Sequence, residues 1–279
     1  MTRSSAAISP TAYATGNFWY RHGLSTAALS TPQGRRLDRG FRLLNSGIKL
    51  ASGVSIDALM LARHLGINEV LARAIDAGRV RQVIEIAAGL SPRGWEFSRR
   101  YPDTLSYIET DLPAMAATKA RMLGAAGLLS QRHRVVTLDA LADDGPQSLA
   151  AIAAMLDPTL GTAIITEGLM NYLDPAAARG VWHRIANTLG RFPEGIYLAD
   201  VYPQKRELSS GLRLLGATLS IFVRGRMHIH FDSDESVVKT MLDAGFTSAL
   251  IHAPAQLNTT REFARVAGGN RVRVLEAST

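Results

Sequence analysis

Short apolar runs alternate with amphipathic segments along most of the chain after Gly78. Most of these runs are rich in β-branched residues and show little polar alternation, which is typical of parallel strands buried on both faces. Seven runs are expected to be strands: 82–87 (QVIEIA), 105–110 (LSYIET), 133–139 (HRVVTLD), 162–168 (TAIITEG), 195–201 (GIYLADV), 248–253 (SALIHA) and 271–277 (RVRVLEA).

Helix start signals precede three of the segments between those runs. Pro113, Pro146 and the pair Asp174–Pro175 each place a proline where the first helical residue is expected. Strands that alternate with helices favour right-handed crossovers. We therefore predict an α/β fold with a doubly wound, seven-stranded, mostly parallel sheet of the Rossmann-like kind.

Helical periodicity marks the chain before the first strand. The segment 56–66 (IDALMLARHLG) predicts one helix, and 67–78 (INEVLARAIDAG) predicts a second, with apolar residues at i, i+3, i+4, i+7 and i+8. The segment Lys205–Phe231 interrupts the strand–helix rhythm and is interpreted as an inserted helical lid. We expect one domain with four parts: an N-terminal helical cap (1–78), a cofactor-binding core (79–204), the lid insertion (205–231) and the C-terminal part of the sheet (232–279).

Composition narrows the class of protein. Hydrophobic residues make up 47% of the 279 residues, enough for a sizeable core, and charged residues make up 20%. The absence of cysteine excludes disulfides and thiolate metal sites, and no other metal site is predicted. The longest apolar stretch near the C-terminal side, LLGATLSIFV, is too short to span a bilayer, and no signal peptide is evident. We expect a cytoplasmic protein without a membrane partner.

The formal net charge of +7 raises the question of nucleic-acid binding. The arginines come in scattered pairs, without a dense basic tract or an interleaved series of aromatic residues. These arginines are best explained as part of a solvated protein surface, and the next explanation is that some of them bind an anionic small substrate. DNA is excluded as a predicted partner and RNA is disfavoured. The sequence leaves a homodimer open.

The stretch 83–94 (VIEIAAGLSPRG) indicates that a ligand approaches the backbone after the first strand. Gly89 follows that strand directly, and ligands of open α/β sheets bind beyond the carboxyl ends of the strands. A dinucleotide fingerprint requires G-x-G-x-x-G, whereas only Gly89 and Gly94 are present. A phosphate loop requires lysine and then serine or threonine, whereas Trp95 and Glu96 follow.

Acidic residues stand at or near the ends of four strands. Glu85 lies in the first strand, Glu109 and Asp111 close the second, Asp139 the third and Glu167 the fourth. Together they suit a ligand with an amine, two hydroxyls and a positive sulfonium, whereas a pyrophosphate would be repelled. These features indicate S-adenosylmethionine as the cofactor.

Several longer stretches resemble one known family. They are TGNFWYRHGLS (15–25), LMLARHLGINEVL (59–71), VIEIAAGLSPRGWEFSRRYP (83–102), YIETDLPAMAATKARML (107–123), HRVVTLDAL (133–141) and ITEGLMNYLDP (165–175). In this order and spacing they resemble the leucine carboxyl methyltransferase family of class I S-adenosylmethionine-dependent methyltransferases, and most closely its tetracenomycin-type polyketide O-methyltransferase branch. After Val201 the resemblance is diffuse.

The resemblance implies roles for residues that match the family's motifs. Arg63 matches the arginine that pairs with the cofactor's carboxylate, Gly89 the turn under its methionyl part, and Asp111 the acid that binds its ribose. The wider class has glycine where Ala87 stands, so the way in which the cofactor approaches the backbone at this residue is not fixed by the resemblance. The full expected cofactor-binding set is Arg63, Glu85, Ala87, Gly89, Glu109, Asp111, Leu138, Asp139, Ala140, Glu167 and Gly168.

The expected reaction is O-methylation of a small, largely apolar metabolite that can carry an acidic group, such as a polyketide-like hydroxyl or carboxyl. A carboxylate needs no general base, whereas a hydroxyl needs one, and the candidates are His228, His230 and His22. The candidate substrate-binding residues are Tyr20, Arg21, Tyr172 and Arg224. The alternatives are a carboxyl methyltransferase of a protein C-terminus or modified tRNA, a nicotinamide oxidoreductase and a non-catalytic cofactor-binding module.

Overall fold

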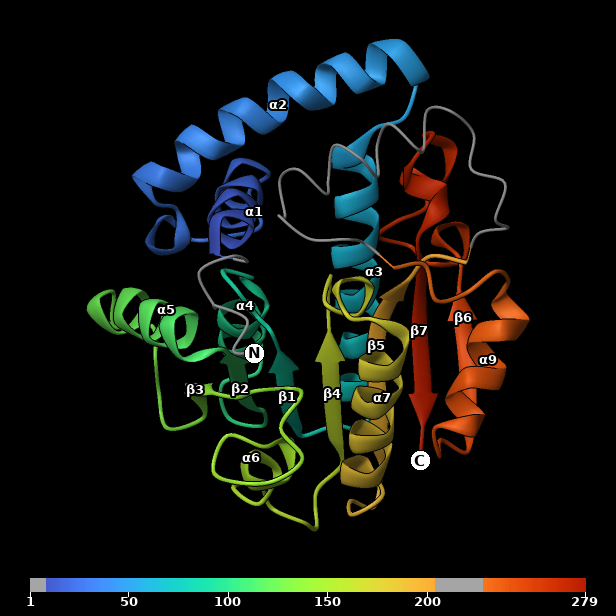
Figure 1. The fold of residues 1–279 in the computed structure, drawn as a ribbon. Coiled ribbons are helices and arrows are strands. Elements are labelled where there is room, and N and C mark those ends of the chain that lie inside the picture. The colour runs from blue at the N-terminus through green and yellow to red at the C-terminus, as the bar shows by residue number, and fades with distance from the viewer. Residues whose placement is uncertain (1–8, 204–227) are drawn as a thin grey trace.

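The computed structural model, which describes residues 9–203 and 228–279, places a central sheet between helices (Figure 1). The sheet consists of β1 (Gln82–Ile86), β2 (Ser106–Asp111), β3 (His133–Thr137), β4 (Thr162–Thr166), β5 (Gly195–Val201), β6 (Ser248–His252) and β7 (Arg273–Ser278). Their order is β3-β2-β1-β4-β5-β7-β6. β7 runs antiparallel to both of its neighbours, and the other neighbouring strands are parallel. The predicted seven-stranded, doubly wound α/β sheet is confirmed.

Side chains of alternate strand residues form two separate cores. Ile84 and Ile164 belong to the core that packs against α6 (Leu149–Ala153), α7 (Pro175–Leu189) and α9 (Asp234–Asp243). Val83 and Ile165 belong to the core on the opposite face, against α3 (Ile56–Asp76) and α4 (Arg93–Arg100). Both faces are therefore apolar, which is why the strands show little polar alternation.

Two of the three predicted helix starts are confirmed. Pro113 begins α5 (Pro113–Ala125), and Asp174 caps α7, because its side chain accepts hydrogen bonds from the amides of Ala176 and Ala177 at 3.0 and 2.9 Å. The start at Pro146 is wrong. The cap of α6 is Ser148, so Pro146 lies in the preceding turn.

The predicted pair of helices over 56–78 is one continuous helix, α3. Gly66 does not interrupt it. A Cβ atom at this position would lie 2.8 Å from Cγ2 of Val274, so glycine allows α3 to pack directly against β7. Close packing thus offsets the cost of glycine inside a helix, about 1 kcal/mol relative to alanine.

Three helices form the upper end of the molecule. α1 (Ser9–Arg21) packs beneath α2 (Pro32–Ser52), which lies across the top and leads into α3 (Figure 1). Phe18, Trp19, Phe41, Ile48 and Met60 are buried between them. The short helix η2 (Ala27–Leu29) joins α1 to α2 and contacts α5. This arrangement is compatible with the predicted cap, whose boundary at residue 78 stays a prediction.

The helices within residues 9–203 and 228–279 are short or polar compared with membrane-spanning helices. No single helix there is long and apolar enough to cross a bilayer. α2 and α3 reach the required length and composition only as a pair, and that pair is bent by 107°. The predicted lid, apart from residues 228–231, falls on residues 204–227, which lie outside the described part of the chain.

Candidate functional site

The turn after β1 lies against the end of β2 at the carboxyl edge of the sheet. Ala87 and Gly89 both have left-handed backbone conformations, with φ of 55° and 48°. Among the described residues Ala87 is the only non-glycine with positive φ. The amide of Gly89 donates to Oδ2 of Asp111 at 2.8 Å, and the amide of Leu112 donates to Oδ1 at 2.8 Å. Asp111 thus fixes the turn that the sequence singled out.

Asp111 retains acceptor capacity for a ligand. Each of its oxygens accepts one backbone hydrogen bond, and a carboxylate has about four lone-pair sites. Burial raises the pKa of Asp111, although the hydrogen bonds from Gly89 and Leu112 partly oppose this effect. The glycine turn and the acid therefore form one hydrogen-bonded unit.

The third strand contributes its residues just beyond β3. The amide of buried Leu138 donates to the carbonyl of Asp111 at 2.9 Å, which joins this segment to the end of β2. Oδ1 of Asp139 accepts from the amide of Leu141 at 2.9 Å. The carbonyl of Ala140 accepts from Nε of Arg184 at 3.2 Å, so it is turned toward α7. Leu138 and Asp139 thus lie next to the Asp111 segment, and their role in cofactor binding stays a prediction.

Arg63 and Glu167 lie side by side although 104 residues separate them. Nε of Arg63 donates to Oε1 of Glu167 at 2.9 Å, and Nδ1 of His64 lies 2.8 Å from Oε2. Burial would raise the pKa of Glu167, but His64, Arg93 and Arg63 outweigh it and hold the pKa well below its usual range. Glu167 is therefore a carboxylate neutralised by its neighbours.

Arg93, which the sequence reasoning missed, lies at the centre of this cluster and is fully buried. Its guanidinium forms ion pairs with Glu85 and Glu167, and its Nε donates to Oδ1 of Asn68 at 2.6 Å. The carboxylates of Glu85 and Glu167 raise the pKa of Arg93 despite its burial. We call Arg63, His64, Glu85, Arg93 and Glu167 the buried ionic cluster.

Two predicted cofactor-binding residues, Glu85 and Glu109, have partners inside the protein. The carboxylate of Glu85 is occupied by Arg93 and by the hydroxyl of Tyr107, which donates at 2.8 Å. That of Glu109 is occupied by Lys119 and by Nε2 of His133 at 2.7 Å. Both carboxylates are essentially unexposed and belong to the interior between the sheet and its helices, so they have no ligand-facing side. Spacing alone could not reveal this, because their partners come from other elements.

Gly168 and Asp200 complete the edge beside Arg63. The amide of Gly168, which has φ of 66°, donates to Oδ1 of Asp200 at 2.7 Å. A Cβ at residue 168 would lie 3.1 Å from Nη1 of Arg63, so glycine allows the guanidinium to approach. Asp200 also lies 3.8 Å from that nitrogen. Asp200 is the last but one residue of the run GIYLADV, so the strand-end rule used for the other acids could have found it.

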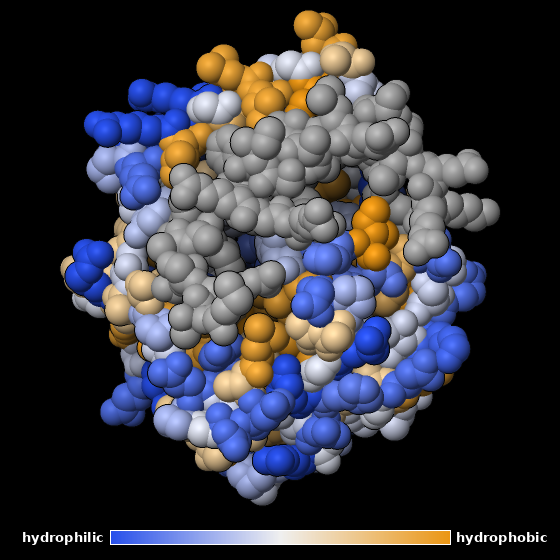
Figure 2. Space-filling view, viewed as in Figure 1, coloured by the Kyte–Doolittle hydropathy of each residue, from blue (hydrophilic) through white to orange (hydrophobic). Residues whose placement is uncertain are grey.

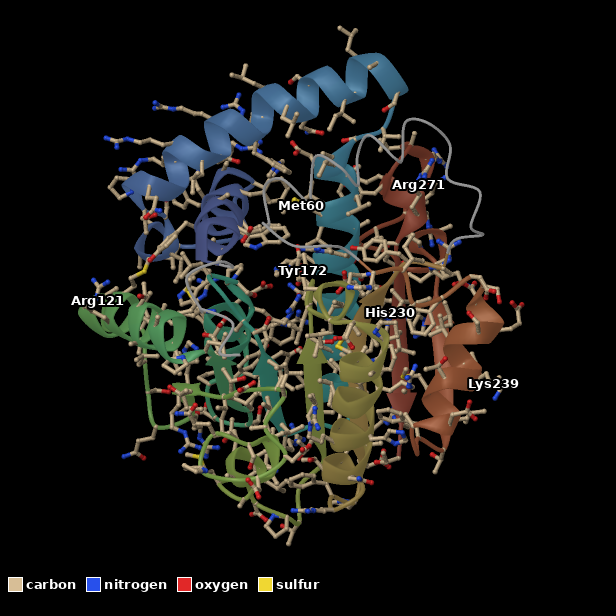
Figure 3. The ribbon with its side chains drawn as sticks, viewed as in Figure 1. Met60, Arg121, Tyr172, His230, Lys239 and Arg271 are labelled. Atoms are coloured by element: carbon tan, nitrogen blue, oxygen red, sulfur yellow. The ribbon has the colours of Figure 1, made fainter. Side chains whose placement is uncertain are left out.

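His230 and Tyr172 lie near the carboxyl edge of the sheet, below the cap (Figure 3). Nε2 of His230 is 2.8 Å from the carbonyl of Met170 in η3 (Met170–Tyr172), and its ring meets Trp182 edge-on. Burial lowers the pKa of His230 and raises that of Tyr172.

The backbone of His228 is held by two hydrogen bonds with Asn171, at 2.8 and 2.7 Å. These contacts attach 228–230 to the loop after β4.

His22 and Arg21 take part in holding the cap together. Arg21 donates to Asp38 at 3.2 Å and lies 3.6 Å from Asp57, and His22 lies 3.7 Å from Asp57. Burial raises the pKa of Asp57, yet His22 and Arg21 lower it overall. Tyr20 is 44% exposed at the end of α1. The fourth candidate substrate residue, Arg224, lies outside the described residues.

The stretch of this chain that matches a family model includes most of this site. The model of the family described as leucine carboxyl methyltransferase matches residues 29–186, more than half of the chain. The chain belongs to the leucine carboxyl methyltransferase family. Within this family's match lie Arg63, the turn at Gly89, Asp111, Asp139 and Glu167. The predicted family is confirmed, and the polyketide branch stays a prediction.

Two bacterial relatives illustrate the sequence similarity. A protein of Mycolicibacterium gilvum assigned as an S-adenosyl-L-methionine-dependent methyltransferase is 32% identical over 131 residues, which is 47% of this chain and 40% of that protein. A protein of Mycobacterium bovis with the same assignment is 39% identical over 112 residues, which is 40% of this chain and 34% of that protein. The chain thus spans well under half of the length of these relatives.

Two solved structures illustrate the similarity of fold. The S-adenosylmethionine-dependent methyltransferase SibL, in its apo form, is 16% identical, with a TM-score of 0.55 over 100% of this chain and 70% of that chain. A protein of Nostoc punctiforme assigned as an O-methyltransferase is 14% identical, with a TM-score of 0.53 over 86% of this chain and 68% of that chain. This chain therefore shares its fold with these two solved proteins.

Proposed function

We propose that this chain is an S-adenosylmethionine-dependent methyltransferase whose cofactor lies over the turn 87–89. The observation that carries this proposal is the graded exposure around Arg63. The Arg63 side chain is 17% exposed and that of Glu167 8%, whereas His64 and Arg93 beneath them are fully buried. The cluster thus presents one guanidinium to a ligand and keeps its other charges inside.

The residues of the edge fit the cofactor's groups. Arg63 has a bidentate fork suited to a carboxylate. Asp111 retains lone pairs for ribose hydroxyls, and Asp139 has an oxygen beyond its bond to Leu141 for an exocyclic amine. Gly89 exposes backbone where a side chain would stand between ligand and turn. Ala87, with its methyl group, is the member that departs from the wider class.

When bound, the cofactor supplies a methyl group on a sulfonium, and the chain's residues position an oxygen acceptor. For a hydroxyl acceptor, we assign Nδ1 of His230 as the atom that accepts the proton of that hydroxyl. The bond of Nε2 to the Met170 carbonyl keeps the proton on Nε2, and the lowered pKa keeps the ring neutral at pH 7. Nδ1 therefore carries a lone pair, and no residue in the described part of the chain forms a hydrogen bond with it. A carboxylate acceptor would need no such base.

The proposed acceptor is an oxygen of a small, largely apolar metabolite that can carry an acidic group, with a polyketide-like hydroxyl or carboxyl as the specific case. Support comes from the motifs shared with that branch of the family and from apolar and arginine residues of 205–231 in the sequence. Extracts incubated with the protein and methyl-labelled cofactor should yield label in organic-soluble small molecules. Label found only in protein or RNA would favour a protein C-terminus or a modified tRNA instead.

Cofactor binding is tested separately by thermal unfolding. S-adenosylhomocysteine at about a hundred times its dissociation constant should add about 2.7 kcal/mol. For a domain of this size the midpoint should rise by roughly 5 °C or more. NAD and ATP serve as controls. A rise with NAD alone would reject the proposed cofactor, and binding without any methylated product would favour a non-catalytic module.

A further inference from the structure

The outward side of α2 combines cations with exposed leucines. We define the α2 face as Arg35, Arg36, Arg39, Arg42, Leu43, Lys49 and Leu50. Leu43 is 78% exposed and Leu50 92%. Arg36, Leu43 and Leu50 follow one another at intervals of seven residues, so they share one line along the helix. Figure 2 shows orange and blue residues together over α2 at the top of the molecule.

The charges of the α2 face are of one sign. Asp38 is the only acidic residue of α2, and it is buried at 2% exposure against Asn17 and Arg21. Within residues 9–203 and 228–279, none of the five cations forms an ion pair with a carboxylate. Surfaces that only face water generally intersperse charges of both signs. This face therefore presents uncompensated positive charge beside apolar side chains.

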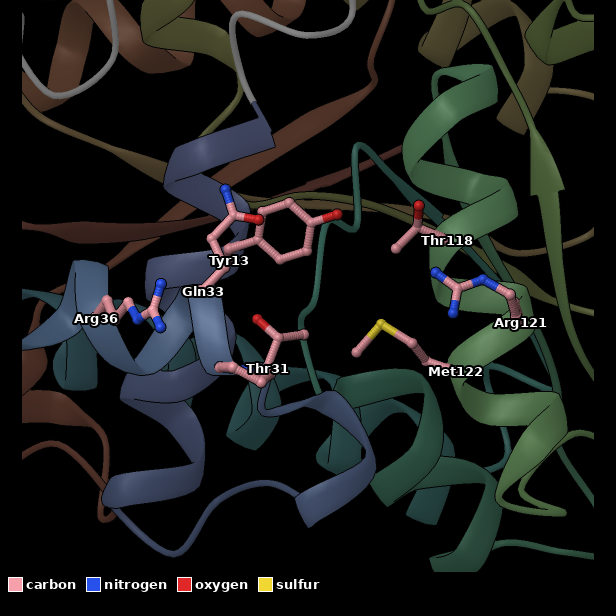
Figure 4. A pocket seen from close by; sticks show the side chains of 8 residues that line it. Tyr13, Thr31, Gln33, Arg36, Thr118, Arg121 and Met122 are labelled. Atoms are coloured by element: carbon pink, nitrogen blue, oxygen red, sulfur yellow. The ribbon is translucent and has the colours of Figure 1, made fainter.

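A groove of about 580 Å³ opens at the N-terminal end of this face, between α1, α2 and α5 (Figure 4). Arg36 of α2 and Arg121 of α5 line it, together with Gln33 and Thr118. Neither arginine is paired with an acid in the described part of the chain. Two guanidinium groups and neutral hydrogen-bonding groups suit a phosphate.

We propose that the α2 face docks on an anionic lipid surface, which departs from the expectation, made from the sequence alone, of a protein without a membrane partner. The leucines enter the boundary of the acyl chains, the five cations lie among the headgroups, and the groove takes one headgroup phosphate. This is the pattern of a helix that lies in the plane of a membrane interface. The leucines favour lipid over nucleic acid, because side chains exposed by 78% and 92% contribute nothing to a contact with phosphates alone. The inference does not depend on methyl transfer.

The test is co-sedimentation of the full chain with vesicles. Vesicles of phosphatidylcholine and phosphatidylglycerol in equal amounts should bind the chain at about 0.1 M NaCl and release most of it at about 1 M, where charges are screened within about 3 Å. Vesicles of phosphatidylcholine alone should bind much less. The double variant Arg35→Gln/Arg39→Gln should bind roughly 25-fold more weakly, about fivefold per charge. Leu43→Ser/Leu50→Ser should bind roughly tenfold more weakly.

The matched control is Arg191→Gln/Lys239→Gln, which removes two positive charges away from α2 and should bind like the wild type. All variants should keep the wild-type unfolding midpoint, because the substituted side chains are exposed. Failure of the wild type to bind anionic vesicles would overturn the proposal, as would an equal loss in the control variant. Unchanged binding of the leucine variant would also overturn it and favour an acidic protein or a nucleic acid as the occupant.

Discussion

The indole of Trp19 stacks on the imidazole of His64, with ring centroids 4.2 Å apart and planes at 25°. Trp19 belongs to α1 of the cap, and His64 belongs to the buried ionic cluster. His64 in turn lies 2.8 Å from Glu167 at the end of β4. A single chain of contacts therefore connects the N-terminal helix to the carboxyl edge of the sheet.

Trp19→Ala should separate the cap from the cluster. Because Trp19 is only 3% exposed, the loss should lower the free energy of unfolding by about 3–5 kcal/mol. Urea unfolding measures this change. Trp95→Ala is the matched control, since Trp95 is partly exposed and has the guanidinium of Arg99 over its ring; it should cost about 1 kcal/mol. Equal losses in the two variants would contradict the role given to the stack.

Arg93→Met should leave Glu85 and Glu167 without their shared partner inside the protein. Removing one side of a buried ion pair costs about 3–5 kcal/mol, and we expect a loss of that size in urea unfolding. Arg73→Met is the control. Arg73 is 51% exposed and pairs with Glu69 one helical turn away, so its loss should cost less than about 1 kcal/mol. A small effect at Arg93 would mean that the cluster does not need its central cation.

Ala87→Gly should stabilise the protein. An alanine in the left-handed conformation costs about 1–2 kcal/mol, and the substitution removes this cost. Glycine also gives the unfolded chain more backbone entropy, which reduces the gain in stability by about 0.5–1 kcal/mol. The net gain in unfolding free energy should be up to about 1.5 kcal/mol. Ala88→Gly, at a neighbour without positive φ, should instead destabilise by about 1 kcal/mol. A loss of stability in both variants would show that Ala87 is not strained.

Asp111→Ala should weaken binding of S-adenosylhomocysteine by about 1–3 kcal/mol, the scale of a lost hydrogen bond to a charged group. Isothermal titration measures the affinity. Asp157→Ala is the control, because Asp157 is exposed and its carboxylate bonds only to Thr159 among the described residues. Wild-type affinity in Asp111→Ala would remove this residue from the site.

Stability should fall in acid because Glu109 and Glu167 have pKa values below their usual 4.5. The unfolded chain then binds protons at a higher pH than the folded chain, so the free energy of unfolding falls as pH drops below about 4.5 and through the folded pKa values. Asp111, whose pKa is raised, acts in the opposite direction. Urea midpoints between about pH 6 and pH 3 test this. A pH-independent midpoint would contradict the neutralised carboxylates.

The strands and their order of appearance were predictable because parallel strands buried on both faces leave a clear apolar signature. The turn at Gly89 and its neighbour Asp111 were predictable for a related reason, since ligands of such sheets bind at strand ends. Asp111 and the turn indeed contact each other. Their position follows from the fold class, without any knowledge of side-chain packing.

The identity of the interior acids was not predictable. Glu109 and Asp111 stand two residues apart on one strand, so they face the same side of the sheet. What separates them is a cation from another element: Lys119 of α5 reaches Glu109. Likewise, Arg93 at the start of α4 looks like a solvated helix residue in the sequence. Such pairings arise only when distant segments pack, so periodicity carries no sign of them.

The place of β7 in the sheet has a consequence for the order in which the protein can mature. β7 is the last of the seven strands in the sequence, yet it lies between β5 and β6. During synthesis on a ribosome, both of those strands keep an open hydrogen-bonding edge until Arg273–Ser278 has emerged, and open edges invite pairing with other chains. The close packing of α3 at Gly66 against Val274 of β7 likewise cannot form before β7 has been synthesised. The pairing of β5 and β6 into one sheet therefore has to wait until β7 has been synthesised.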